Sequence, residues 1–300
     1  VSAPLSLGDF VANLCLIYAD LRGQYMLRSF LLITRFWNLL IIGLAQYFTV
    51  FFLIDPEKIY DLRLLLVSVS TLLIAAGGYI INDYYDVKID LVNKPERVVI
   101  GKGIKRRYAI FLHTLLSLSG VALGFFVSWK VGALNFFCAF LLWLYSNALK
   151  RQPFVGNFAV ALLTGLSIWI VNVFYPPLSV AIIIYSLFAF FITLVREIIK
   201  DLEDLKGDDT FGCKTLPIVW GIRPTKNFIY FLLGFFSLSV ITLNLYVTTL
   251  PMTFFAWTLF LPMAALLGWL VRADTKSDFF LLSQFCKVIM LAGIISMAFL

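Results

Sequence analysis

Nine apolar runs, separated by short polar stretches, restrict what this chain can fold into. They span residues 29–54, 62–82, 107–128, 130–149, 154–175, 177–199, 226–248, 251–271 and 278–300. About 20 apolar residues are what an α-helix needs to cross a bilayer. Charged residues make up only 14% of the chain, whereas soluble domains usually carry about 25%. The sequence therefore predicts an all-α, polytopic membrane protein with nine transmembrane helices in one bundle.

Beside nine spans, the 300 residues leave no room for a separate soluble domain, so we expect one membrane-embedded domain over residues 1–300. The segment 10–22 is too short and interrupted to cross, and we expect residues 1–28 to form an interfacial segment. The N-terminal residues lack the basic region of a cleavable signal, so insertion is expected to rely on the spans. Residues 83–106 and 200–225 are expected to form loops that cap one membrane face.

Positive charge is distributed unevenly between the two sides that nine spans define. On the N-terminal side lie 19 of the 24 Lys and Arg residues, three lie opposite (Lys58, Arg63 and Lys130), and two lie inside runs (Arg35 and Lys287). Because cytoplasmic loops carry the excess of Lys and Arg, the 19-charge side should face the cytoplasm. The net charge of +7 thus reflects orientation in the membrane and does not indicate nucleic-acid binding, which requires a solvated basic face.

The first acidic motif follows the second run. An amide and two carboxylates, Asn82, Asp86 and Asp90, recur there at intervals of four residues. At about 3.6 residues per turn, side chains with this spacing share one face of a helix that continues from the run.

The second acidic motif follows the sixth run, where Asp201, Asp204 and Asp208 recur at intervals of three and four residues and again share a helix face. Ten of the 17 carboxylates lie in these two stretches. Both stretches end an even-numbered run on the side assigned to the cytoplasm. This suggests two structurally equivalent halves whose acids converge at one opening.

Packed carboxylates repel one another unless a cation neutralises them. Oxygen ligands without His or Cys are typical of a hard cation, and Mg²⁺ is commonly held by one or two carboxylates together with substrate phosphates. The two motifs therefore predict a polyphosphate substrate that bridges two Mg²⁺ clusters. A calcium-binding EF-hand is excluded because its glycine and terminal glutamate spacing is missing.

Polar residues near the acids are candidate substrate ligands. Arg35 and Asn38 lie inside the first run, where an ionisable group is costly and usually functional, although a structural ion pair is the alternative for Arg35. Arg97 closely follows the first motif and could clamp phosphate. The other candidates are Lys94, Tyr145, Ser146, Lys150 and Lys200. An interfacial belt with a snorkelling lysine also explains the residues around 145–150. His113 is alone in mid-span and is expected to be a hydrogen-bonded structural residue.

The two motifs resemble the UbiA superfamily of intramembrane prenyltransferases. The matching pattern reads Asn82-x-x-x-Asp86-x-x-x-Asp90, Asn93-x-Pro95-x-Arg97, Asp201-x-x-Asp204-x-x-x-Asp208 and Gly212-x-Lys214-Thr215. The resemblance implies a bundle around a lipid-facing cavity and two Mg²⁺ ions that bridge an isoprenyl diphosphate.

The resemblance also implies roles for individual residues. It implies that metal is held by Asn82, Asp86, Asp90, Asp204 and Asp208. It makes Asp201 a metal ligand, a base or an acceptor contact, and it makes Arg97 the second catalytic candidate. It places substrate-binding polar residues at Arg35, Lys94, Arg97, Tyr145 and Lys150.

Within the superfamily, the pattern is closer to digeranylgeranylglyceryl phosphate synthases and chlorophyll synthases than to haem-O synthases. The run after Arg97 lacks both prolines of the usual Arg-Pro-Ile-Pro-Ser-Gly, which leaves the loop conformation and the acceptor open. Mg²⁺ and basic side chains would neutralise the diphosphate so that an allylic cation forms and the acceptor captures it. We favour the hydroxyl of geranylgeranylglyceryl phosphate as acceptor, giving an ether lipid, with an aromatic quinone precursor or a chlorophyll-type acceptor as alternatives.

Two other protein classes fit the motifs less well than a prenyltransferase. A transporter would more naturally place its acids on broken helices at mid-membrane. A CDP-alcohol phosphotransferase would carry an Asp-Gly start and a downstream Ala-Arg, which the motifs lack. The expected partners are therefore an isoprenyl diphosphate, a lipophilic acceptor and membrane lipids. No obligatory protein partner and no nucleic acid is indicated.

Overall fold

The computed structural model describes residues 29–299 except 94, 96–97, 248–253 and 255, and every regular element in this part is helical. The longer helices are α2 (Phe36–Leu53), α3 (Leu62–Asn93), α4 (Arg106–Val127), α5 (Trp129–Asn147), α6 (Val155–Phe174), α7 (Val180–Glu203), α10 (Ile222–Val247), α12 (Leu261–Arg272) and α13 (Lys276–Ser296). The shorter ones are η1 (Pro56–Tyr60), η3 (Leu149–Arg151), α8 (Leu205–Thr210), α9 (Leu216–Trp220), η4 (Ala256–Phe260) and η5 (Met297–Phe299). The expected interfacial segment, residues 1–28, lies outside the described residues.

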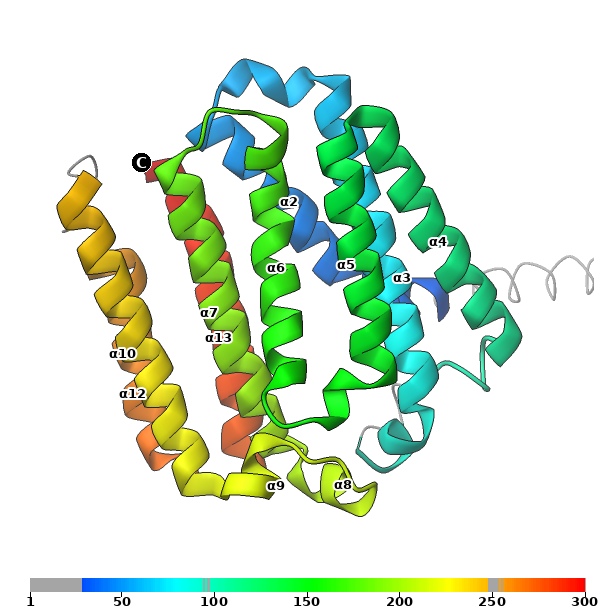
Figure 1. The fold of residues 1–300 in the computed structure, drawn as a ribbon. Coiled ribbons are helices and arrows are strands. Elements are labelled where there is room, and N and C mark those ends of the chain that lie inside the picture. Colours follow the sequence, from blue (N-terminus) through cyan, green and yellow to red (C-terminus); the bar gives the residue numbers. More distant parts are fainter. Residues whose placement is uncertain (1–28, 94, 96–97, 248–253, 255, 300) are drawn as a thin grey trace, which may run out of the picture.

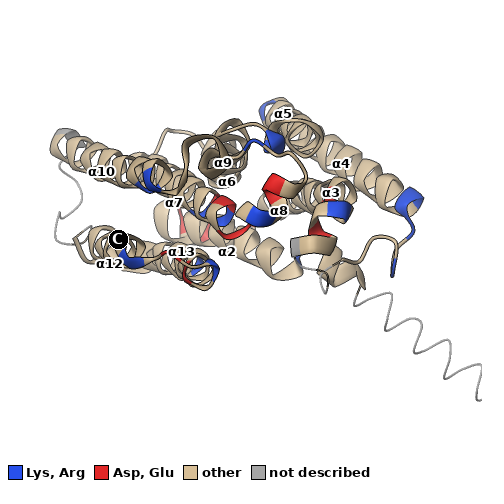
Figure 2. Ribbon diagram, turned by 90° about the horizontal axis from the view of Figure 1, so that it is seen from below, with Lys and Arg blue, Asp and Glu red and all other residues tan. Residues whose placement is uncertain are grey.

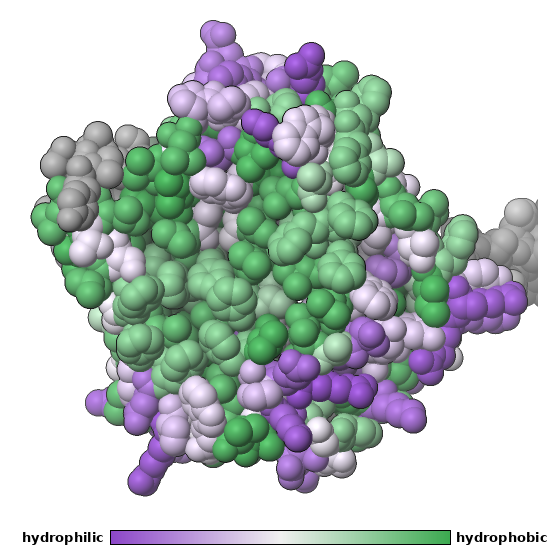
Figure 3. All heavy atoms as spheres, viewed as in Figure 1, coloured by the Kyte–Doolittle hydropathy of each residue, from purple (hydrophilic) through white to green (hydrophobic). Residues whose placement is uncertain are grey.

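The predicted spans all correspond to helices. Eight helices of the described chain are long and apolar enough to cross a membrane, and a shorter apolar helix, Ala256–Arg272, stands at the eighth run. Their side chains form a broad hydrophobic band with hydrophilic residues gathered at both ends (Figure 3). This is the surface expected of a multi-pass membrane protein, and it confirms the predicted fold class.

The core is centred on α7, of whose apolar window 72% is buried. α7 packs against α6, α13 and α10, while α3 packs against α4 and α5. Figure 1 shows α10 and α12 at one edge of the bundle and α4 at the other. The largest buried cluster joins side chains from α7, α10, α12 and α13, among them Phe188, Ile198, Phe236, Leu266 and Leu282. Because lipid is as apolar as these side chains, close van der Waals packing holds the helices together.

Polar groups inside the bundle are hydrogen-bonded between helices. The ring Nδ1 of His113 on α4 lies 3.0 Å from the carbonyl oxygen of Gly77 on α3, which confirms the predicted structural role. The amide of Asn135 on α5 donates to the hydroxyl of Ser70 at 2.9 Å. Here α4 comes so close to α3 that a Cβ at Gly120 would lie 2.7 Å from a Ser70 carbonyl oxygen.

Both cap segments are more helical than expected. With 32 residues at about 1.5 Å each, α3 is longer than the roughly 30 Å hydrocarbon core, so its last turns extend the helix beyond the predicted span. Residues 200–225 contain α8 and α9. After α3, the segment without prolines forms a tight turn at Gly101, with φ of 92°. The Gly101 N–H donates to Ile104 O at 2.8 Å, and the Gly103 N–H donates to Val99 O at 2.8 Å.

Candidate active site

The first acidic motif lies on the last three turns of α3. The helix runs unbroken through Asn93, so Asn82, Asp86 and Asp90 share one face as predicted. The Asn82 Oδ1 atom is buried and accepts no hydrogen bond from the described residues. An amide oxygen in this state is available to a cation.

Lys150, on η3 between α5 and α6, forms an ion pair with Asp86 of this motif. Its ammonium lies 2.5 Å from Asp86 Oδ1, and the two side chains are only 9% and 16% exposed. η3 brings Lys150 inward by turning the chain between α5 and α6. The turn depends on Gly156, since a Cβ there would lie 2.8 Å from Lys150 Cα. Lys150 therefore supplies the positive charge that the carboxylate needs in the described structure.

The second acidic motif is broken in the middle, which corrects the expectation of a single continuous helix face. α7 ends at Glu203, Asp204 has non-helical ψ of 8°, and α8 begins at Leu205. Asp201 is thus on α7 and Asp208 on α8, yet the two carboxylates remain within electrostatic range. Asp201 Oδ2 accepts a hydrogen bond of 2.8 Å from the amide of Asn157 on α6.

Arg35 enters the site from the start of α2. Its backbone has φ of 51° and ψ of 54°, a left-handed conformation that interrupts the predicted run 29–54. Its guanidinium pairs with Asp83 at 2.9 Å and lies 4.9 Å from the centroid of the Tyr79 ring. Asn38, the other predicted ligand of this run, lies one turn further along α2. The Arg35 side chain is still 40% exposed, so it can turn toward a ligand.

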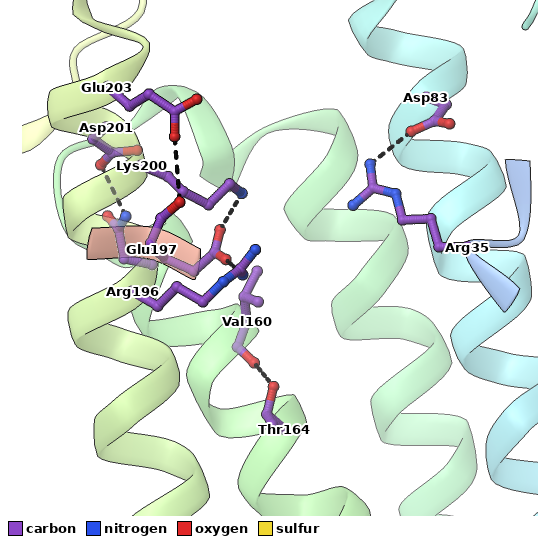
Figure 4. Close-up of polar contacts among 11 residues, drawn as sticks. Arg35, Asp83, Val160, Thr164, Arg196, Glu197, Lys200, Asp201 and Glu203 are labelled. Atoms are coloured by element: carbon purple, nitrogen blue, oxygen red, sulfur yellow. Dashed lines mark hydrogen bonds and ion pairs between the residues drawn. The ribbon is translucent and has the colours of Figure 1, made fainter. Parts of the chain in front are cut away.

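A charge triplet on α7 was not recognised from the sequence. Glu197 accepts hydrogen bonds from Arg196 at 2.6 Å and from Lys200 at 2.9 Å, and its side chain is only 9% exposed. Arg196 and Glu197 lie about one turn before Asp201, and Lys200 directly precedes it (Figure 4). The available signal was three charges spaced i, i+1 and i+4 in a helix whose preceding residues, 180–195, carry no charge.

The two motifs meet at one end of the bundle. α3 contacts α8, and Figure 2 shows acidic and basic residues gathered over α3, α7 and α8 at this end. Tyr145, near the end of α5, lies within electrostatic range of both Asp86 and Asp201. The Lys214 N–H donates to Arg151 O at 3.0 Å, tying the loop after α8 to η3. Burial raises the pKa of the Cys213 thiol in this loop, and Asp208 raises it further.

Three predicted substrate ligands are not seen in this group. Lys94 and Arg97 lie outside the described residues. Ser146 is 1% exposed, and its hydroxyl donates to Leu142 O of its own helix at 2.9 Å. Four residues that were not predicted do belong to the site: Asp83, Asn157, Arg196 and Glu197.

The site is rich in oxygen ligands but is not a closed metal cage. Among the described residues, no three His, Cys, Asp or Glu side chains converge closely enough to hold an ion. Mg²⁺ usually takes only one or two carboxylates and completes its shell with water and substrate phosphate oxygens. The donor set, with the available Asn82 oxygen, therefore fits Mg²⁺ that arrives with a phosphorylated ligand.

Comparison with known proteins identifies relatives that match more than half of the chain. The model of the UbiA prenyltransferase family matches residues 39–285. A digeranylgeranylglyceryl phosphate synthase from Sulfurisphaera tokodaii is 35% identical over 234 residues, which are 73% of this chain and 79% of that relative. Matches to other archaeal proteins of the same name cover between 58% and 71% of their lengths.

Solved structures share the arrangement of helices. A structure of digeranylgeranylglyceryl phosphate synthase in membranes is similar with a TM-score of 0.68 and 27% identity, over 92% of this chain and 99% of that one. A UbiA homologue from Archaeoglobus fulgidus bound to GPP and Mg²⁺ is similar with a TM-score of 0.64. It is 15% identical over 90% of this chain and 99% of its own, so it bears on the fold alone.

Proposed function

We propose, from the premise that this chain belongs to the UbiA prenyltransferase family, that it transfers a geranylgeranyl group from its diphosphate to geranylgeranylglyceryl phosphate. The observation that carries the proposal is the meeting of two acidic motifs, on α3 and on α7–α8, at one polar end of an apolar bundle. The relatives named digeranylgeranylglyceryl phosphate synthase support this acceptor. The product would be an ether lipid.

Mg²⁺ is the cofactor that the donor atoms suit. We assign one ion to Asn82, Asp86 and Asp90 and a second to Asp204 and Asp208, with Asp201 beside it. When bound, Mg²⁺ would neutralise the diphosphate leaving group. Displacing Lys150 from Asp86 would release an ammonium next to the same phosphates, where it would add a charge-assisted hydrogen bond.

Basic side chains from α2, η3 and the segment after α3 would bind the diphosphate. Arg35 and Lys150 approach from α2 and η3, and Lys94 and Arg97 follow the first motif. As the C1–O bond breaks, its electron pair leaves with the diphosphate, and these positive charges would stabilise it. Tyr145, which lies within electrostatic range of both motifs, would contact the substrate.

The acceptor hydroxyl would then form the new bond. Its oxygen attacks C1 of the allylic cation, giving the ether C–O bond, and its proton passes to a carboxylate, for which we propose Asp201. The hydrogen bond from Asn157 at 2.8 Å fixes one oxygen of Asp201 and leaves the other for the proton. Asp201 would thus act as base, with Asn157 orienting it.

The apolar interior would hold the isoprenoid tail. A cavity of about 60 Å³ lies between α2, α6, α7 and α13, lined by Ile42, Ile168, Phe188, Met290 and Ile294 among others. Its lining is almost entirely apolar, as an isoprenoid tail requires. The cavity meets α7 at Phe188 and Ala189, at least three turns before Asp201, so the tail would extend along the bundle from the polar end toward it.

Product analysis tests the proposal. Purified protein in lipid nanodiscs is incubated with geranylgeranyl diphosphate and either geranylgeranylglyceryl phosphate or a hydroxybenzoate, with Mg²⁺ or with EDTA. We expect an ether-lipid phosphate and free diphosphate only with Mg²⁺ and the glyceryl phosphate. Transfer to the aromatic ring alone would contradict the acceptor assignment. Mg²⁺-independent transfer would contradict the metal assignment.

A further inference from the structure

The charge triplet on α7 sets two cations against one bonded carboxylate. Arg196 and Lys200 share the single carboxylate of Glu197, whereas Arg35 is matched by Asp83, and Lys150 by Asp86. The carboxylate of Asp201, next to Lys200, lies within electrostatic range of the group but is hydrogen-bonded to Asn157. Two cations held close together in a partly buried setting attract an anion that can bridge them, because screening by water is weak there.

The triplet is also held rigidly. Glu197 uses both carboxylate oxygens, Oε1 toward Arg196 and Oε2 toward Lys200. The side chains of Arg196 and Glu197 are 19% and 9% exposed. This arrangement fixes the positions of both cations before a ligand arrives, so little side-chain entropy remains to be lost on binding.

Arg196 still has a donor to offer. Its Nε atom is buried and has no hydrogen-bond acceptor among the described residues. A buried N–H without a partner costs free energy, and an arginine that presents several parallel donors is suited to a phosphate. The unpartnered Nε is a separate observation from the two cations around Glu197, and it also indicates an anionic ligand such as a phosphate.

The triplet faces the reaction site rather than lipid. Figure 4 shows the side chains of Arg196, Glu197 and Lys200 extending from α7 toward the side on which Arg35 and Asp83 lie. Tyr79 on α3 is within electrostatic range of Arg196. Asp201, the proposed base, directly follows Lys200 in the sequence.

We infer that Arg196 and Lys200, positioned by Glu197, form a binding site for the phosphate monoester of the acceptor lipid. The inference rests on the proposed function, and it separates the two anions of the reaction. The diphosphate of the donor is held by the two acidic motifs with Mg²⁺, whereas the acceptor phosphate is held by the triplet. This places the glyceryl hydroxyl near Asp201.

Acceptors with and without the phosphate test the assignment. For wild-type protein and Arg196→Gln, kcat/KM is measured with geranylgeranylglyceryl phosphate and with uncharged geranylgeranylglycerol. We expect the variant to lose about 10- to 100-fold with the phosphate, the effect of one hydrogen bond to a charged group. With the uncharged acceptor it should change little, and its KM for geranylgeranyl diphosphate should stay the same. Arg223→Gln, which removes an exposed arginine at the same membrane face, serves as the control and should keep the wild-type ratio.

The outcomes separate this inference from the proposed function. If wild-type protein does not use geranylgeranylglyceryl phosphate, the proposed function fails. If it does, and Arg196→Gln loses equally with both acceptors or raises only the KM for the diphosphate, the acceptor site is overturned. Should Arg196→Gln not fold, Arg196→Lys keeps the charge but lacks the Nε donor and the planar fork. A wild-type preference for the phosphorylated acceptor in Arg196→Lys would equally overturn the assignment.

Discussion

The ammonium of Lys150 and a carboxylate oxygen of Asp86 lie 2.5 Å apart, although 64 residues separate them in the chain. The pair joins η3 to α3 at the polar end of the bundle. Lysine thus occupies the place on the first motif that we assign to Mg²⁺. Lysine and metal should therefore compete for Asp86.

Lys150→Met tests this competition. Without Mg²⁺, the variant leaves a mostly buried carboxylate unpaired, so we expect a loss of about 1–3 kcal/mol of stability. Mg²⁺ together with geranylgeranyl diphosphate should narrow this loss because the metal then neutralises Asp86. Thermal unfolding with and without these ligands measures both effects. The control is Lys88→Met, which removes an exposed lysine from α3, the helix that carries Asp86. It should unfold at the same temperature as wild type. If Mg²⁺ and geranylgeranyl diphosphate do not reduce the difference in unfolding temperature between Lys150→Met and wild type, Asp86 is not a metal ligand.

Substitutions of Arg35 can separate the effect of its backbone conformation on stability from the effect of its side chain on substrate binding. At φ of 51° an L-residue costs about 1–2 kcal/mol, which glycine largely avoids. Arg35→Gly should therefore unfold at a higher temperature than Arg35→Met. Both variants lose the guanidinium, so both should raise the KM for geranylgeranyl diphosphate by about 10-fold or more. A wild-type KM in either variant would show that Arg35 does not bind the diphosphate.

Orientation in the membrane can be tested with single cysteines. In a variant whose four native cysteines are replaced by alanine, Lys102→Cys and Tyr60→Cys probe opposite ends of the bundle. Tyr60 is 87% exposed, and Lys102 is also exposed. By the positive-inside rule, an impermeant thiol reagent added to intact cells should label Tyr60→Cys, and it should label Lys102→Cys only after permeabilisation. The reverse pattern would place the active site outside.

The fold and the first motif could be predicted because their signals are local. A run of 20 apolar residues identifies a span from its length alone, and the spacing of Asn82, Asp86 and Asp90 fixes their common face once α3 continues through them. The second motif has the same kind of spacing. Its helix nevertheless ends at Glu203, and helical spacing gives no sign of that break.

The partners of the site residues could not be predicted, because they come from tertiary structure. Spacing does not reveal that Asn157 on α6 would donate to Asp201. Arg196 and Glu197 look in sequence like ordinary charges near a helix end, and only their burial shows that they face the bundle interior. Ser146 matched a polar pattern at a helix end, but its hydroxyl is used by its own helix.

The central claim is that the two acidic motifs act together on one Mg²⁺-bound diphosphate. Its most direct test is the rate of diphosphate release in Asp86→Asn and Asp204→Asn, measured with geranylgeranyl diphosphate, the glyceryl phosphate acceptor and Mg²⁺. Each should fall by at least about 10²-fold, the usual effect of removing one stabilising group from a transition state. Asp209→Asn, at an exposed position on α8, should keep the wild-type rate. Wild-type turnover in either Asp86→Asn or Asp204→Asn, in protein that is folded and inserted, would contradict the account.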